Sequence, residues 1–99
     1  MKKVNLDQLR SVPILDVAER LGIEIVHSGS SYAMRDAEDG SHITSLTVFP
    51  SSNRWKRWSG IERGGVSGGG TIDLVMHIKN TSDVSEAVRW LSDNFSSHI

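Results

Sequence analysis

Apolar residues first recur at helical spacing between residues 13 and 21. The spacing i, i+3, i+4, i+7 places side chains on one face of a helix. This spacing is matched by Ile14, Val17, Ala18 and Leu21. Ser11 is a candidate N-cap, Pro13 suits a first turn, and Gly22 can end a helix in the left-handed conformation. The pattern predicts a short amphipathic helix.

Between residues 23 and 59 the pattern changes to the alternation that is typical of strands. The predicted strands cover residues 23–25, 31–35, 43–49 and 54–59. The short connections between them favour an antiparallel meander. In the fourth strand, alternation points Trp55 and Arg57 to one face of the sheet. It points Arg54, Lys56 and Trp58 to the other face.

A glycine-rich loop over residues 60–70 precedes a predicted helix over residues 71–78. A last helix begins at Asp83-x-x-Glu86, which resembles a capping box, and carries an apolar stripe. This order predicts an α+β fold: a small antiparallel sheet of four or five strands, an N-terminal helix and two C-terminal helices. The chain has 99 residues, so we expect a single domain spanning residues 1–99.

Composition narrows the classes of function. The chain has no Cys, which excludes disulfides, thiolate zinc sites, iron–sulfur clusters and a cysteine nucleophile. No apolar run is long enough for a transmembrane helix, and the first residues lack the apolar stretch of a signal peptide. We therefore expect a cytoplasmic protein with no membrane partner.

The net charge of −1 hides an uneven distribution. Residues 1–50 carry 5 basic and 7 acidic side chains, and residues 71–99 carry 2 basic and 4 acidic ones. Residues 51–70 carry 4 basic and 1 acidic side chain, a net charge of +3. A local basic patch, rather than the total charge, decides where a polyanion docks.

The basic window also contains Trp55 and Trp58. They are three residues apart, so they lie on opposite faces of an ideal strand, and one can be buried while the other is exposed. An exposed Trp beside Arg and Lys is suited to single-stranded nucleic acid, because the ring stacks on a base while the cations hold phosphates. An ordinary solvated strand face remains the alternative.

Other patterns give weaker signs of a binding site, and none indicates a catalytic site. The residues Gly68, Gly69, Gly70 and Thr71 open a helix and form a candidate phosphate-contact loop, although no P-loop Lys is present. The alternative is a tight connection that lets the chain cross another element. Asp36, Asp39 and His42 fit a surface acidic turn better than a metal site. No nucleophile elbow is present, so we expect no catalysis and no cofactor.

Residues 14–91 resemble the N-terminal zinc-binding domain of bacterial DnaG-type primases over about four fifths of the chain. The early helix, the strand over residues 31–34 and the strand over residues 43–48 match in order. The most specific matches are Gly68–Val75, beside the family's "G-G-D-A-I-D-F-V", and Ser82–Leu91, beside "S-F-x-E-A-V-x-x-L". The resemblance implies a domain that meets single-stranded template DNA while a separate domain polymerises the primer.

One departure is large, because the family's zinc ligands are missing. The first ligand pair aligns with Asp36 and Asp39, and the second falls near Trp58 and within residues 61–65. We therefore expect a metal-free relative, of the kind found in primase-like or Toprim-containing proteins of phages, plasmids and other mobile elements. Packing of Trp58 would then replace part of the metal's contribution.

The resemblance and the basic window together imply a non-catalytic module that binds single-stranded DNA in replication. The candidate contacts are Arg54, Trp55, Lys56, Arg57, Trp58 and Arg63, with Arg35 as a weaker one. A primase, helicase or Toprim-containing protein is the implied protein partner, and the chain can also be the front domain of a larger primase. The alternative is a protein–protein adaptor in a replication or mobilisation assembly, which has lost DNA binding together with zinc.

Overall fold

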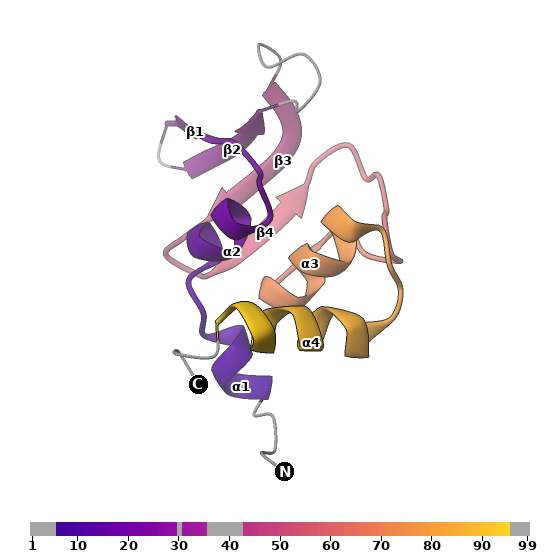
Figure 1. Cartoon of the computed structure of the whole chain (residues 1–99). Coiled ribbons are helices and arrows are strands. Elements are labelled where there is room, and N and C mark those ends of the chain that lie inside the picture. Colours follow the sequence, from indigo (N-terminus) through magenta and orange to yellow (C-terminus); the bar gives the residue numbers. More distant parts are fainter. Residues whose placement is uncertain (1–5, 30, 36–42, 96–99) are drawn as a thin grey trace.

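The computed structural model describes residues 6–29, 31–35 and 43–95 (Figure 1). Within them lie four helices and five strands. In chain order these are α1 (Leu6–Arg10), α2 (Ile14–Arg20), β1 (Ile25–Ser28), β2 (Ser31–Arg35), β3 (Ile43–Phe49), β4 (Arg54–Arg57), β5 (Gly68–Gly69), α3 (Thr71–Lys79) and α4 (Val84–Asn94). The α+β class and the small sheet with N-terminal and C-terminal helices are confirmed. None of the described helices is long and apolar enough to cross a membrane.

The five strands form one antiparallel meander in the order β1-β2-β3-β4-β5. In the β3–β4 pair, Val48 stands opposite Trp55, and Thr47 stands opposite Lys56. Residues directly opposite in an antiparallel pair share a face. Val48 and Trp55 therefore face one side of the sheet, and Thr47 and Lys56 face the other.

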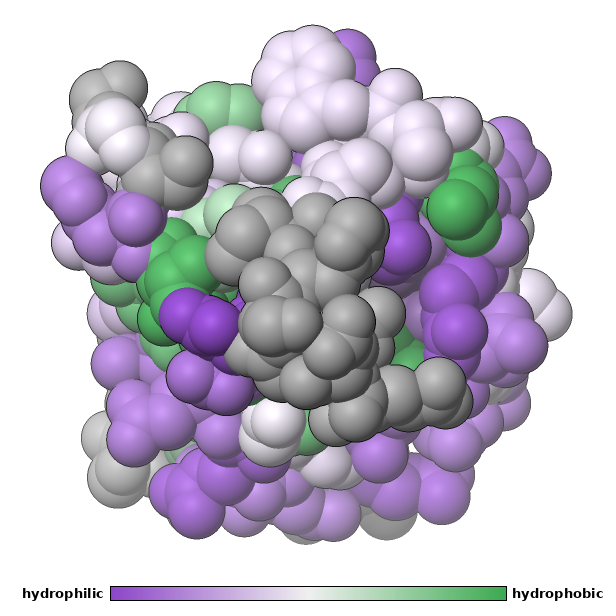
Figure 2. Space-filling view, turned by 90° about the horizontal axis from the view of Figure 1, so that it is seen from above, coloured by the Kyte–Doolittle hydropathy of each residue, from purple (hydrophilic) through white to green (hydrophobic). Residues whose placement is uncertain are grey.

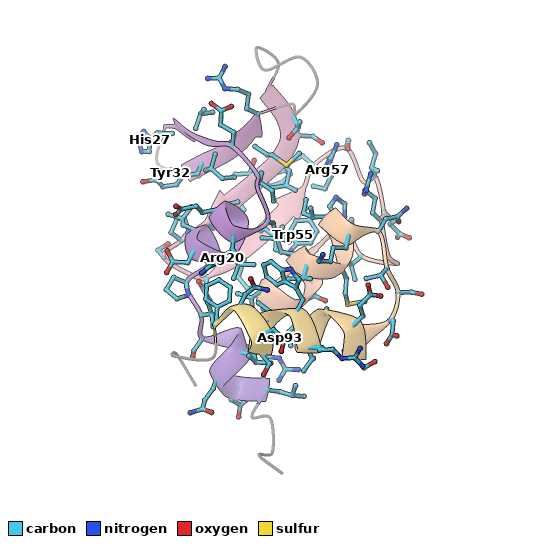
Figure 3. All side chains as sticks on the ribbon, in the orientation of Figure 1. Arg20, His27, Tyr32, Trp55, Arg57 and Asp93 are labelled. Carbon is cyan, nitrogen blue, oxygen red and sulfur yellow. The ribbon has the colours of Figure 1, made fainter. Side chains whose placement is uncertain are left out.

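The core lies on the Trp55 side of the sheet. Trp55 is 2% exposed, and its ring centroid is 4.7 Å from that of His77 on α3. Figure 3 shows Trp55 between the sheet and α3. The helices contribute buried residues to the same cluster, namely Leu9, Ile14, Val17, Ala18, Leu74, Val75, Ala87 and Leu91. One face of the sheet is thus covered by helices.

Helix α2 begins and ends for reasons that the sequence shows only in part. Gly22 has φ +80°, and Ile23 N–H donates to the carbonyl of Ala18, so the expected left-handed stop is confirmed. This stop occupies residues 21–24, and β1 therefore begins at Ile25 rather than at Ile23. The prediction of Ser11 as the N-cap is wrong. Its hydroxyl donates to a carbonyl of α1, while Asn53 Oδ1 accepts from Ile14 N–H at 2.7 Å.

Two elements are missing from the prediction. Helix α1 has five residues, and its single apolar pair at i, i+3, Leu6 and Leu9, is too short a pattern to predict a helix. Strand β5 consists of two glycines paired with β4. A Cβ on Gly68 would lie 3.1 Å from the carbonyl oxygen of Trp55, so glycine lets this part of the chain run close to β4.

Candidate nucleic-acid interface

The face of the sheet opposite the core carries Arg54, Lys56 and Trp58. All three side chains are exposed, and that of Trp58 is 60% exposed. Alternation along β4 places them there, because the intervening Trp55 must face the helices. This part of the sequence-based hypothesis, one buried and one exposed Trp, is confirmed. We call Arg54, Lys56 and Trp58 the open-face group.

The orientation of Trp58 is fixed by three neighbours. Its Nε1–H donates to Thr47 Oγ1 at 3.1 Å. The Lys56 ammonium lies 4.5 Å from the centre of the indole ring, within the range of a cation–π contact. Phe49 lies edge-on, with its ring centroid 6.5 Å away. The exposed ring is therefore held in place beside a cation. Period-two alternation along β3 is the signal by which Thr47 and Phe49 could have been found.

Trp55 does not belong to this surface, which corrects its prediction as a stacking residue. Its indole Nε1–H donates to the carbonyl of Gly70 at 2.9 Å. The ring is buried against α3 and has no face on which a base could stack. Its role is to hold the sheet against the helices.

The other three predicted contacts, Arg35, Arg57 and Arg63, lie on the helix side of the sheet. They line one cavity of about 430 Å³ together with Glu24 and His77. Arg35 Nε lies 3.3 Å from a carboxylate oxygen of Glu24. The structure therefore does not bring them together with Arg54, Lys56 and Trp58, and the predicted patch divides into two groups.

His77, which no sequence pattern singled out, connects Arg57 to the core. Its Nδ1 lies 3.0 Å from the carbonyl oxygen of Val66, which can only accept, so Nδ1 carries the proton. Its Nε2 is then an acceptor and faces Arg57 Nη1 at 3.4 Å. Burial lowers the pKa of His77 below its usual 6.5, and the charges of Arg57 and Arg63 lower it further, although the bond to Val66 opposes them. The neutral tautomer fits both contacts.

The glycine-rich loop is less open to a phosphate than the sequence predicts. The Asp73 carboxylate accepts from Gly70 N–H at 3.0 Å and so occupies the N-terminus of α3. Thr71 is fully buried, and its hydroxyl donates to the carbonyl of Leu9 at 2.9 Å. A bound phosphate would face a carboxylate and could not reach Thr71. This corrects the prediction for Thr71 and favours the alternative of a tight connection.

Only the second of the family's two pairs of zinc positions lies among the described residues, and it contains no Cys or His. Asp36, Asp39 and His42 lie outside the described residues. At the second pair, Trp58 offers only an N–H donor, and in residues 61–65 the Arg63 guanidinium stands beside one carboxylate, Glu62. In the described part of the chain no three His, Asp or Glu side chains gather as metal ligands do. We derive no metal chemistry for this protein.

The hypothesis that packing of Trp58 replaces the metal is wrong, because that side chain is mostly exposed. Polar contacts hold the loop after β4 instead. Arg63 donates to the carbonyls of His77 and Ile78 at 2.9 and 3.3 Å. Gly64 N–H donates to Asn80 Oδ1 at 3.1 Å. These bonds tie the loop to the C-terminal end of α3.

Seen from above in Figure 2, the described surface is mostly hydrophilic. The described hydrophobic residues that are visible in this view lie in small patches. The exposed large hydrophobic side chains of the described residues come from three parts of the chain: Leu6, Trp58 with Ile61, and Val84.

No protein-family model and no curated protein matches the chain. Among solved structures, the chain is similar to that titled the Aquifex aeolicus primase, zinc binding and RNA polymerase domains. The TM-score is 0.69, and the sequences are 24% identical over 96% of this chain. The match spans 22% of the length of the Aquifex chain. The protein therefore has a primase-related fold.

Proposed function

We propose that the protein is a non-catalytic module that binds single-stranded DNA through the open-face group in a replication context. The observation that carries the proposal is an exposed, oriented Trp58 ring with a Lys56 ammonium 4.5 Å from its centre. The ring supplies a stacking surface for a base, and Lys56 and Arg54 supply charges for the flanking phosphates.

The primase-related fold supports a nucleic-acid role, since a primase acts on a DNA template. The sequence resemblance to the zinc-binding domain supports the same role, because the basic window coincides with that family's aromatic strand. A primase, helicase or Toprim-containing protein would supply the polymerising or unwinding activity. The chain would act as the accessory or front domain of such a protein.

The test is the binding of a fluorescently labelled single-stranded oligonucleotide to Trp58→Ala and Lys56→Gln variants over a salt series. Base stacking contributes about 1–3 kcal/mol, so Trp58→Ala should weaken binding by about 5- to 150-fold. Its salt slope should not change. Lys56→Gln should make the slope shallower by about 0.7, the contribution of one phosphate contact on a single strand.

Arg89→Gln is the matched control, because Arg89 is an exposed residue of α4 that loses the same charge. It should leave both the affinity and the salt slope unchanged. Unaltered binding by Trp58→Ala, at a melting temperature equal to that of the wild type, would reject the open-face group. If Arg89→Gln weakens oligonucleotide binding as much as Lys56→Gln does, the binding is an unspecific attraction to a charged protein.

The second candidate is the protein–protein adaptor. Its support is the absence of all Cys ligands in a zinc-domain pattern, since a domain can keep its fold and lose its first role. Tryptophan fluorescence distinguishes the two. Trp55 is buried and Trp58 exposed, so an oligonucleotide on the open face should quench the emission of the wild type much more than that of Trp58→Phe. A flat titration at low salt favours the adaptor.

A further inference from the structure

We propose that the cavity lined by Arg35, Arg57 and Arg63 binds a phosphomonoester, with the phosphate on the guanidinium groups and the organic part on an apolar wall. This site lies on the helix side of the sheet and does not depend on the open-face group. Its volume of about 430 Å³ falls within the range of small-molecule sites, about 300–1,000 Å³.

The charges in the cavity are unbalanced. Three guanidinium groups line it, and Glu24 is the one carboxylate among its described lining residues. Glu24 pairs with Arg35, and its side chain is 67% exposed. No described carboxylate lies within ion-pair distance of Arg57 or Arg63. Since His77 is neutral there, the described lining residues carry a net charge of +2, three cations less one anion.

The partners of Arg57 and Arg63 orient these side chains without neutralising them. Arg57 Nε donates to Ser45 Oγ at 3.0 Å, and Nη1 faces the neutral His77 ring. Arg63 uses Nε and Nη2 on two carbonyls of α3. In Figure 3, Arg57 is labelled near α3, on the side of the molecule opposite His27 and Tyr32. Held guanidinium groups of this kind suit a phosphate, because their planar N–H groups match its oxygens.

The rest of the lining selects an organic phosphate over a bare anion. Leu21, Ile23, Met34 and Ile78 provide an apolar wall on the cavity. An apolar wall beside oriented polar groups is the usual composition of a small-molecule site. The phosphomonoester could belong to a free mononucleotide or to the 5′ end of an oligonucleotide, and the experiment separates these sources.

The test is calorimetric titration of the full chain with AMP, adenosine, inorganic phosphate and inorganic sulfate. AMP should bind saturably and more tightly than phosphate, while adenosine and sulfate should bind at least about tenfold more weakly than AMP. Arg57→Gln should weaken AMP binding at least about tenfold, the effect of one lost charge-assisted hydrogen bond. Glu24→Gln should strengthen it, because the competing carboxylate is removed.

Arg54→Gln is the matched control, since it removes a guanidinium from the other face of the sheet and should leave AMP binding unchanged. If Arg57→Gln does not fold, the expected increase in AMP affinity of Glu24→Gln still tests the proposal. Weaker or unchanged binding by Glu24→Gln would overturn the proposal, as would equal binding of sulfate and AMP. Tighter binding of a 5′-phosphorylated trinucleotide than of AMP identifies a strand end as the source, and the reverse order identifies a free nucleotide.

A failure of this site is distinguishable from a failure of the proposed function. Trp58→Ala should weaken binding of a 5′-hydroxyl oligonucleotide and leave AMP binding intact. Arg57→Gln should do the opposite. If both variants weaken both ligands equally, the two sites are not separate, and the inference is wrong.

Discussion

At the scale of single residues, His77 couples the core to the charged cavity. Its ring contacts Trp55 on one side, and its two nitrogens face Val66 and Arg57. Protonation would turn Nε2 into a donor facing the Arg57 guanidinium, which is also a donor and a cation. The neutral form is therefore part of the folded structure.

This arrangement predicts a loss of stability at acidic pH. In the unfolded chain His77 has the ordinary pKa of 6.5, and in the folded protein burial and the two arginines lower its pKa. Between the two values the unfolded chain binds more protons, so stability falls as the pH drops. The contribution is complete above about pH 6.5 and declines below it. Urea unfolding between about pH 8 and about pH 5 measures this decline.

His77→Gln is the test variant, and His27→Gln is its control. His77→Gln should be less stable at neutral pH and should show a flatter dependence on pH. His27 is exposed on β1, so His27→Gln should keep the slope of the wild type. An equally steep decline in His77→Gln would show that other groups cause it.

Prediction from the sequence succeeds best where a residue's environment depends on its own strand or helix. The alternation that separates Trp55 from Trp58 and the glycine stop of α2 are local, and both are confirmed. The N-cap of α2 comes instead from Asn53, which is 39 residues away. The position of Arg57 beside His77 depends likewise on the packing of α3 against the sheet. No local pattern encodes such contacts. Alternation along β4 does separate Arg57 from Arg54 and Lys56, as predicted, but it could not show that Arg35 and Arg63 join Arg57 at one cavity.

At the scale of elements, the connection between β4 and α3 is the most constrained. Gly64 has φ +64°, and a Cβ there would lie 2.7 Å from the carbonyl oxygen of Met76. The loop therefore crosses the end of α3 at a distance that only glycine allows. The zinc-domain pattern predicts a metal at this point, whereas the structure has hydrogen bonds from Arg63 and Gly64.

We expect Gly64→Ala to be far more destabilising than Gly65→Ala. Both residues have positive φ, and for alanine the left-handed conformation costs about 1–2 kcal/mol. Gly65 has nothing within 4 Å of an added Cβ, so Gly65→Ala should lose only this amount. Gly64→Ala adds a clash with the backbone of α3 and the following turn. The free energy of unfolding in urea compares them, and equal losses would disprove the close crossing.

At the scale of the whole molecule, the main question is whether the fold needs a metal. One sheet face is covered by buried residues from all four described helices, which pack in a single cluster with the fully buried Leu46 and Val48 of β3. The cluster is continuous from α1 to α4, and we expect it to stabilise the fold without a metal. The sequence resemblance predicts the same metal-free state from the missing cysteines.

The purified protein should therefore contain far less than one equivalent of zinc, as measured by atomic emission spectroscopy. Dialysis against a chelator should leave the melting temperature unchanged, because metal-dependent folds lose their structure when the ion is removed. One equivalent of tightly bound zinc, or a fall in melting temperature that added zinc reverses, would contradict this.

The alternation along β4 has a consequence for how this protein can vary. The four residues of β4, Arg54–Arg57, point alternately to two chemically different surfaces. The length of the preceding turn, residues 50–53, determines which side chain faces which surface. Inserting one residue there would turn Lys56 toward the helices and Trp55 toward solvent, and would damage both surfaces and the core at once. Inserting two residues would preserve the faces. An insertion of an even number of residues is therefore the kind that this turn can accept, provided that Asn53 still reaches α2. Side chains on the two surfaces can change independently, but the register of β4 cannot.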